Sequence, residues 1–207
     1  ALLLGLLLLP GLAGAHTEAG PAAEVGFEQR LGEQVPRDLT FRDEAGRPVT
    51  LAEAGAGKPV ALMLLYYRCT MLCPVILDAA LRTLPALPFQ PGKEFTIVTL
   101  SIDPRETPQQ AARKQAETLA RAEVSVPPGG WRFLTGEQEA ITRLARAVGF
   151  RYRYEAEEDE YAHAAGLVLL TAGGRVSRYF YGVELAPRDL RLGLVEAFGS
   201  GKGRPAR

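Results

Sequence analysis

Apolar residues along the middle of the chain form two runs of strand length. Residues 59–66 and 95–102 are almost continuously apolar, which is typical of strands buried on both faces. Between them, the segment 75–84 carries leucines at helical spacing, which predicts a helix with one inward stripe. The middle of the chain therefore alternates strand and helix.

Two other segments alternate apolar and polar residues around a turn, which predicts β-hairpins. The first joins strands at 39–42 and 47–51, and the second joins strands at 166–171 and 175–181 around Ala172-Gly173-Gly174. We also expect a loop at 52–58, a helix from Pro108 to about Glu123 with Thr107 as N-cap, a strand at 131–134, a helix over 137–148 capped by Thr135, a strand at 150–154 and a helix over 187–198.

This order of elements predicts an α/β fold with a mixed central sheet flanked by helices. A pair of cysteines at the first helix after a central strand, followed later by a hairpin and a last helix, is the order of a thioredoxin-like fold. The hairpin over 39–51 is then an extra N-terminal β-hairpin. We expect this domain to span residues 32–198.

The N-terminal residues predict export. A leucine-rich run, a proline and the small-x-small pattern Ala13-Gly14-Ala15 indicate that residues 1–15 are a cleaved signal peptide. The run is shorter than the roughly 20 residues that span a bilayer, and a retained membrane anchor is the alternative. We expect residues 16–31 to be a flexible lead, residues 199–207 to be a flexible tail, and the protein to be periplasmic or otherwise extracytoplasmic.

The composition limits the classes of function that the protein is expected to have. Of 207 residues, 47% are hydrophobic and 23% are charged, as in an ordinary globular protein with a core. Lysine plus arginine and aspartate plus glutamate number 24 each, so there is no basic excess to neutralise phosphates, and nucleic acid is not an expected partner. His16 and His163 are the two histidines, which leaves few candidates for a metal site that uses imidazole.

The two cysteines of the chain, Cys69 and Cys73, stand where the first buried strand turns into a helix. If the helix begins near Cys69, residues four apart share a face with Cβ atoms about 5–6 Å apart. The sulfurs can then close a disulfide or hold one soft metal ion, and the helix N-terminus favours thiolate. A purely structural disulfide is the alternative, although so small a ring removes only about 2 kcal/mol of unfolded-chain entropy, against about 4.7 for a long loop.

Two thiolates suit Cu(I) and also Zn(II), but they leave the coordination shell incomplete. His163 precedes the hairpin strand that, in a thioredoxin-like sheet, faces the start of the cysteine helix. We therefore expect His163 to supply a third ligand, and a Cys₂His site tolerates both Cu(I) and Cu(II). The alternative is that His163 is an ordinary surface or core residue.

Thiol–disulfide exchange is the competing use of the cysteines. General thiol–disulfide enzymes usually have two residues between the cysteines, and here there are three. Thioredoxins carry a proline immediately before the hairpin strand, whereas this chain has Ala164-Ala165 there. A peroxiredoxin-type site is also incomplete, because Thr70 is suitably placed before Cys73 but Tyr66 stands where a proline is needed.

Several segments together resemble the SCO/SenC family, the copper proteins of cytochrome c oxidase assembly, over roughly residues 32–198. The first matches the family's CxxxCP motif, and the others follow it in the family's order. They are Cys69-Thr70-Met71-Leu72-Cys73-Pro74, Ser101-Ile102-Asp103-Pro104-Arg105-Glu106-Thr107-Pro108, Trp131-Arg132-Phe133-Leu134-Thr135-Gly136 and Tyr161-Ala162-His163.

The resemblance implies copper bound by Cys69, Cys73 and His163. It also implies delivery of copper to, or reduction of cysteines in, the dinuclear copper site of oxidase subunit II, or of another exported copper protein, so the expected partner is membrane-associated. Thr70 and Leu72 depart from the proline and acidic residue that members often have. Two alternatives remain: a metal-free thiol–disulfide reductase of thioredoxin-like fold, and an inert exported domain with a structural disulfide.

Four other features carry weaker expectations. Asp103 follows a buried strand and is either near the site or a turn-forming residue. Met71 offers a thioether or simply packs. His16 becomes the N-terminal residue after cleavage and would then be able to bind Cu(II). The acidic segment 155–160 is either a solvated loop or steers a basic partner.

Overall fold

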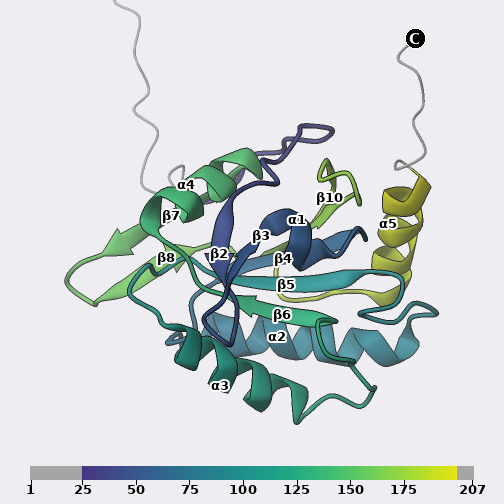
Figure 1. Cartoon of the computed structure of the whole chain (residues 1–207), viewed down its shortest axis with the longest axis horizontal. Coiled ribbons are helices and arrows are strands. Elements are labelled where there is room, and N and C mark those ends of the chain that lie inside the picture. The colour runs from purple at the N-terminus through teal and green to yellow at the C-terminus, as the bar shows by residue number, and fades with distance from the viewer. Residues whose placement is uncertain (1–24, 200–207) are drawn as a thin grey trace, which may run out of the picture.

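The computed structural model describes residues 25–199 (Figure 1). Its central sheet has five strands in the order β10-β9-β4-β5-β6. Strands β4, β5 and β6 are parallel, whereas β9 pairs antiparallel with β4 and β10. The predicted mixed sheet is thus confirmed. The strands are β4 (Val60–Leu65), β5 (Thr96–Ser101), β6 (Trp131–Leu134), β9 (Gly166–Leu170) and β10 (Val176–Tyr181).

Every residue of β4 and β5 is buried, as the continuous apolar runs predict for strands covered on both faces. The helices that surround the sheet are α2 (Leu72–Thr83), α3 (Pro108–Leu119), α4 (Gln138–Ala147) and α5 (Pro187–Gly199). Helix α3 packs on β6, and α5 packs on β9 and β10, while α2 runs along the sheet in Figure 1. The parallel strands therefore direct their carboxyl ends toward the cysteine motif between β4 and α2.

A second, three-stranded antiparallel sheet has the order β1-β7-β8. It contains β1 (Gly26–Phe27), β7 (Phe150–Glu155) and β8 (Glu160–His163). Two expectations need correction here: β8 lies where the sequence predicted only a loop, and β1 lies inside the segment predicted as a flexible lead. The Phe27 ring packs edge-on against Phe150, Tyr179 and Tyr181, so the folded part begins before residue 32.

The N-terminal hairpin pairs β2 (Thr40–Arg42) with β3 (Pro48–Thr50). Directly after it, α1 (Leu51–Gly55) replaces part of the predicted loop at 52–58. Its capping box has the Thr50 hydroxyl accepting from the Glu53 N–H, with the Glu53 carboxylate accepting in return from Thr50, which stabilises a short helix start. Three smaller findings complete the elements: a 3₁₀ turn at Leu84–Ala86, an end of α3 at Leu119 rather than near Glu123, and Glu137 rather than Thr135 as the N-cap of α4.

The predicted signal peptide (1–15), the first part of the predicted lead, and residues 200–207 lie outside the described residues. Within residues 25–199, no helix has the length and apolar character needed to cross a membrane.

Gly149 lies against the backbone of Glu28, the residue that follows β1, and a side chain at this position is expected to lower the stability. Its φ is +63°, and a Cβ built there would lie 1.8 Å from the Glu28 carbonyl oxygen, while its own carbonyl accepts from the Glu28 N–H at 2.7 Å. We expect Gly149→Ala to lower the free energy of unfolding by about 2 kcal/mol or more, from left-handed strain plus overpacking. Urea denaturation measures the loss.

Gly32→Ala is the matched control. Gly32 also has a positive φ, +79°, but a Cβ added there would meet no atom within 4 Å. Gly32→Ala should therefore lower the free energy of unfolding only by the cost of left-handed strain, about 1 kcal/mol. Equal losses in the two variants would contradict the proposed clash at Gly149.

Candidate metal centre

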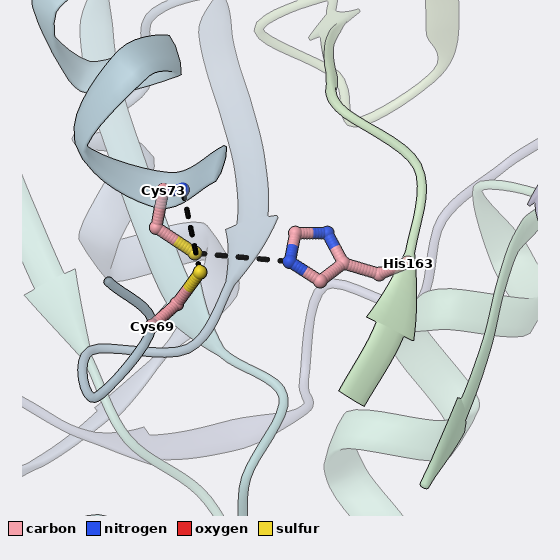
Figure 2. Close-up of side chains that lie close together, drawn as sticks. All are labelled: Cys69, Cys73 and His163. Carbon is pink, nitrogen blue, oxygen red and sulfur yellow. Dashed lines mark hydrogen bonds between the residues drawn. The ribbon is translucent and has the colours of Figure 1, made fainter. Parts of the chain in front are cut away.

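The cysteine motif forms the connection between β4 and α2. Cys73 is the second residue of α2, whereas Cys69 lies in the turn before it. This corrects the expectation of a helix beginning near Cys69. The sulfurs still meet, because the Cys73 backbone N–H donates to Cys69 Sγ at 3.5 Å (Figure 2). The helix N-terminus thus contacts the Cys69 sulfur, as expected for a group that favours thiolate.

His163 approaches the cysteines from the last residue of β8. Its ring points across the gap toward the sulfurs (Figure 2), and Nε2 lies 3.7 Å from Cys73 Sγ. The opposite nitrogen, Nδ1, lies 3.0 Å from the Ala164 carbonyl oxygen. Because a carbonyl can only accept, this hydrogen bond requires the proton on Nδ1. The Nε2 lone pair is then directed at the sulfurs, as in metal-binding histidines whose other nitrogen is held by the protein.

The three side chains form a group that fits one ion. Their ligand atoms all lie within 4.8 Å of one another. With zinc as a guide, metal–sulfur bonds of about 2.3 Å and metal–nitrogen bonds of about 2.0 Å place two ligands on one ion at most about 4.6 Å apart. Only small movements are therefore needed to close the group around an ion. Within residues 25–199, no other set of three or more His, Cys, Asp or Glu side chains has this arrangement.

The two thiols differ in acidity. A hydrogen bond from the Cys73 thiol lowers the pKa of Cys69, burial opposes this, and the backbone N–H groups of Cys73 and Met71 lower it further. The same hydrogen bond, together with burial, raises the pKa of Cys73. Cys69 is therefore the more acidic of the two and the one that favours the thiolate form, whereas Cys73 favours the thiol.

Glu106 holds the backbone just before Cys69, a role that sequence reasoning missed. It lies in the loop after β5 and is 5% exposed. One carboxylate oxygen accepts from the Tyr67 N–H at 2.7 Å and from the Ser101 hydroxyl at 2.6 Å, and the other accepts from the Arg68 N–H at 2.7 Å. Burial raises the pKa of Glu106 despite these hydrogen bonds. Its position in the motif 101–108 was visible, but its contact with residues 67 and 68 had no local signal.

Charged side chains join the cysteine loop to the β7–β8 hairpin that carries His163. Arg68 bonds Asp103 at 2.6 Å and Asp159 at 3.1 Å, and Arg105 bonds the same two carboxylates at 2.9 and 2.6 Å. The Tyr161 hydroxyl also lies 3.4 Å from Asp103. Asp103 is fully buried, and although burial raises its pKa, hydrogen bonds from Arg105 and Arg68 outweigh that effect and keep it lowered. Asp103 is thus the turn-forming residue of one expectation, since its Oδ1 also accepts from the Arg105 N–H at 3.0 Å. It also lies near the site through these ion pairs, but it is not part of the ligand group.

The remaining candidates lie apart from the ligand group. The Met71 side chain is 70% exposed and lines a hollow beside Cys69. The acidic segment 155–160 contains the last residue of β7, the turn, and the first residue of β8. Only its Asp159 takes part in the ion pairs described above. His16 lies outside the described residues.

Comparison with known proteins assigns the chain to a family. The family model SCO1/SenC matches residues 28–192, so the chain belongs to the SCO1/SenC family, as the motifs predicted. No curated protein sequence matches.

Solved structures show the same fold. A candidate electron transfer protein from Aquifex aeolicus VF5 is 29% identical with a TM-score of 0.74, over 84% of this chain and 97% of that one. Arabidopsis thaliana ScoI with copper bound is 21% identical, with a TM-score of 0.64 over 83% and 99% of the two chains. BsSco, a member of the Sco family of cytochrome c oxidase assembly proteins, is 21% identical, with a TM-score of 0.61 over 82% and 96%. The thioredoxin-like fold is confirmed.

Proposed function

We propose that this protein is a copper metallochaperone that assists assembly of the dinuclear copper site of cytochrome c oxidase subunit II. The observation that carries the proposal is the convergence of Cys69, Cys73 and His163, whose ligand atoms all lie within 4.8 Å of one another. Membership of the SCO1/SenC family and the copper in related structures support copper as the metal.

The donor set suits copper in either oxidation state. Thiolates are soft ligands that favour Cu(I), and the imidazole nitrogen also suits Cu(II). The three residues are also unequally accessible: Cys73 is fully buried, whereas Cys69 and His163 retain 7% and 9% exposure and line the hollow. An incoming thiolate of an acceptor protein therefore reaches the site from the side of Cys69 and His163, and Cys73 is the ligand that it reaches last.

The proposal includes export. The leucine-rich start and the small-x-small pattern before residue 16 support a cleaved signal peptide, which places the protein on the same side of the membrane as an extracytoplasmic copper domain. Cell fractionation after expression of the full chain tests this part. Recovery of uncleaved protein in the cytoplasm would contradict it.

Transfer to an acceptor tests the proposed function. We expect reduced protein loaded with one Cu(I) per chain to give up its copper to the reduced, soluble copper domain of a subunit II, measured by separating the two proteins and quantifying copper in each. His163→Ala should bind copper at least about 10-fold more weakly, since even residues that only support a ligand commonly contribute 10–100-fold. Copper that stays on the wild-type donor would contradict the proposal.

Thiol reduction is a second activity that the same site supports. The Cys69 thiolate lines the hollow and is positioned to attack a disulfide of the partner, and the Cys73 thiol then resolves the mixed disulfide. The cysteines become a disulfide, and the partner's disulfide takes up two electrons and the proton of the Cys73 thiol. One partner sulfur leaves as a thiol, and the other leaves as a thiolate that takes its proton from water. Metal-free protein that reduces oxidised subunit II but not insulin would indicate a dedicated reductase, whereas reduction of both would indicate a generalist.

A further inference from the structure

A hollow of about 500 Å³ opens beside Cys69 and His163. It lies between the connection that precedes α2 and the β7–β8 hairpin, and the rings of Tyr66 and Tyr161 contribute to its lining. These two rings also contact each other, with centroids 5.5 Å apart. A group that enters the hollow therefore meets aromatic surface and the Cys69 sulfur together.

The edge of the hollow formed by the start of α2 is apolar and exposed. Met71 and Leu72 line it and are 70% and 41% exposed, and Val75, one turn further along α2, is 41% exposed. Exposed apolar side chains that cluster in this way, rather than singly, mark interaction sites on soluble proteins. Because this edge adjoins the metal-ligand group, whatever covers it also covers the route to Cys69.

The opposite edge is acidic. Glu155, Glu158 and Glu160 line it. Glu155 accepts hydrogen bonds from Arg153, but Glu158 and Glu160 form no ion pair with any residue in the range 25–199. Arg68 and Arg105 form their ion pairs with Asp103 and with Asp159 of the hairpin turn. The uncompensated charge at this edge is therefore negative.

We propose that the hollow docks an exposed loop of the acceptor protein in which an apolar side chain is flanked by lysine or arginine. The proposal rests on the proposed function, because it assigns a partner chemistry to the same site. The apolar side chain covers Met71 and Leu72 and fills the hollow, while the basic residues face Glu158 and Glu160. Such complementarity mainly sets the association rate and the choice of partner.

The segment that precedes Val25 is the competing occupant, because Val25 itself lines the hollow. The charge of this segment does not complement the acidic edge of the hollow, since residues 1–24 contain Glu18 and Glu24 but no lysine or arginine. The acidic edge would repel this segment and attract a basic loop, so the complementarity favours a partner protein.

Peptide binding to the full chain tests the proposal. The probe is a fluorescent peptide with a Leu-Phe core flanked by lysines, and its counterpart has glutamates in place of the lysines. We expect anisotropy titrations to show at least about 10-fold tighter binding of the lysine peptide, which weakens with added salt as for other interactions between exposed charges. The double variant Glu158→Lys/Glu160→Lys should lose this preference, and Met71→Ser should bind both peptides more weakly.

Glu123→Lys/Glu184→Lys is the matched control, because it makes the same charge change at two glutamates that do not line the hollow. It should keep the preference for the lysine peptide. An equal loss in both double variants would overturn the proposal, as would a wild-type protein that does not distinguish the peptides. Cross-linking of residues 1–24 into the hollow, or self-association that protects it, would also overturn it.

Copper stoichiometry is measured on the same samples to separate the two proposals. One Cu(I) per chain without peptide preference would overturn the docking inference and leave the proposed function intact. Peptide preference without copper binding would contradict the proposed function instead.

Discussion

Cys73→Ser is expected to lower the affinity for Cu(I) by more than about 100-fold, because it removes a thiolate ligand where changes to residues that merely support ligands already cost 10–100-fold. The Cys73 side chain is fully buried, with Sγ 3.7 Å from His163 Nε2. A serine hydroxyl is a hard donor that does not replace thiolate for Cu(I). Competition with a chromophoric Cu(I) chelator, under anaerobic conditions, measures the loss.

Met71→Leu is the control for Cys73→Ser. It removes a thioether sulfur beside the hollow, but Met71 is 70% exposed and is not part of the ligand group. Its affinity should therefore stay close to that of the wild type. A Cys73→Ser protein that binds copper as tightly as Met71→Leu would show that the metal is held elsewhere.

Glu106→Ala should cause a large loss of stability, about 3 kcal/mol in the free energy of unfolding. It leaves the Tyr67 and Arg68 N–H groups without their acceptor, while the Ser101 hydroxyl keeps the Asp103 carbonyl at 3.3 Å. A buried donor without a partner costs about 1–3 kcal/mol. The substitution also removes the cost of burying the Glu106 carboxylate, and this offsets part of the loss of stability. Urea denaturation of the reduced, metal-free protein measures the change without any contribution from copper binding.

Glu123→Ala provides the comparison, since a glutamate outside any such network should change stability by no more than about 0.5 kcal/mol. Glu106→Gln should fall between the two, because the amide accepts at its oxygen but presents its NH₂ group to a backbone donor. Should Glu106→Ala lose no more than Glu123→Ala, the anchoring role assigned to Glu106 would be wrong.

The parts of the fold that the sequence predicted are those with a strong local pattern. The continuous apolar runs became β4 and β5, buried throughout, and Thr107-Pro108 marked the start of α3. The position of His163 opposite the cysteines followed from the order of elements, since the residues before the hairpin strand face the start of the cysteine helix in a thioredoxin-like sheet. In the structure its ring nitrogen lies within 4.8 Å of the sulfurs.

The elements and contacts that the sequence did not predict leave only weak or non-local patterns in it. Strand β8 has only four residues, Glu160–His163, directly after an acidic turn, and four residues are too few for alternation to outweigh that composition. Helix α1 did carry a signal, the Thr50–Glu53 capping box, but it is five residues long within a glycine- and alanine-rich stretch. The ion pairs between Arg68 and Asp159 join residues 91 positions apart, and the Glu106 contacts span 38 and 39 positions. Neither is visible in local patterning.

The central claim is that Cys69, Cys73 and His163 hold one copper ion together, and copper K-edge X-ray absorption tests it most directly. For the Cu(I)-loaded wild-type protein we expect two sulfur neighbours and one imidazole nitrogen, and for His163→Ala the same sulfur shell without the imidazole scattering. A wild-type spectrum without imidazole, or one that His163→Ala leaves unchanged, would contradict the account.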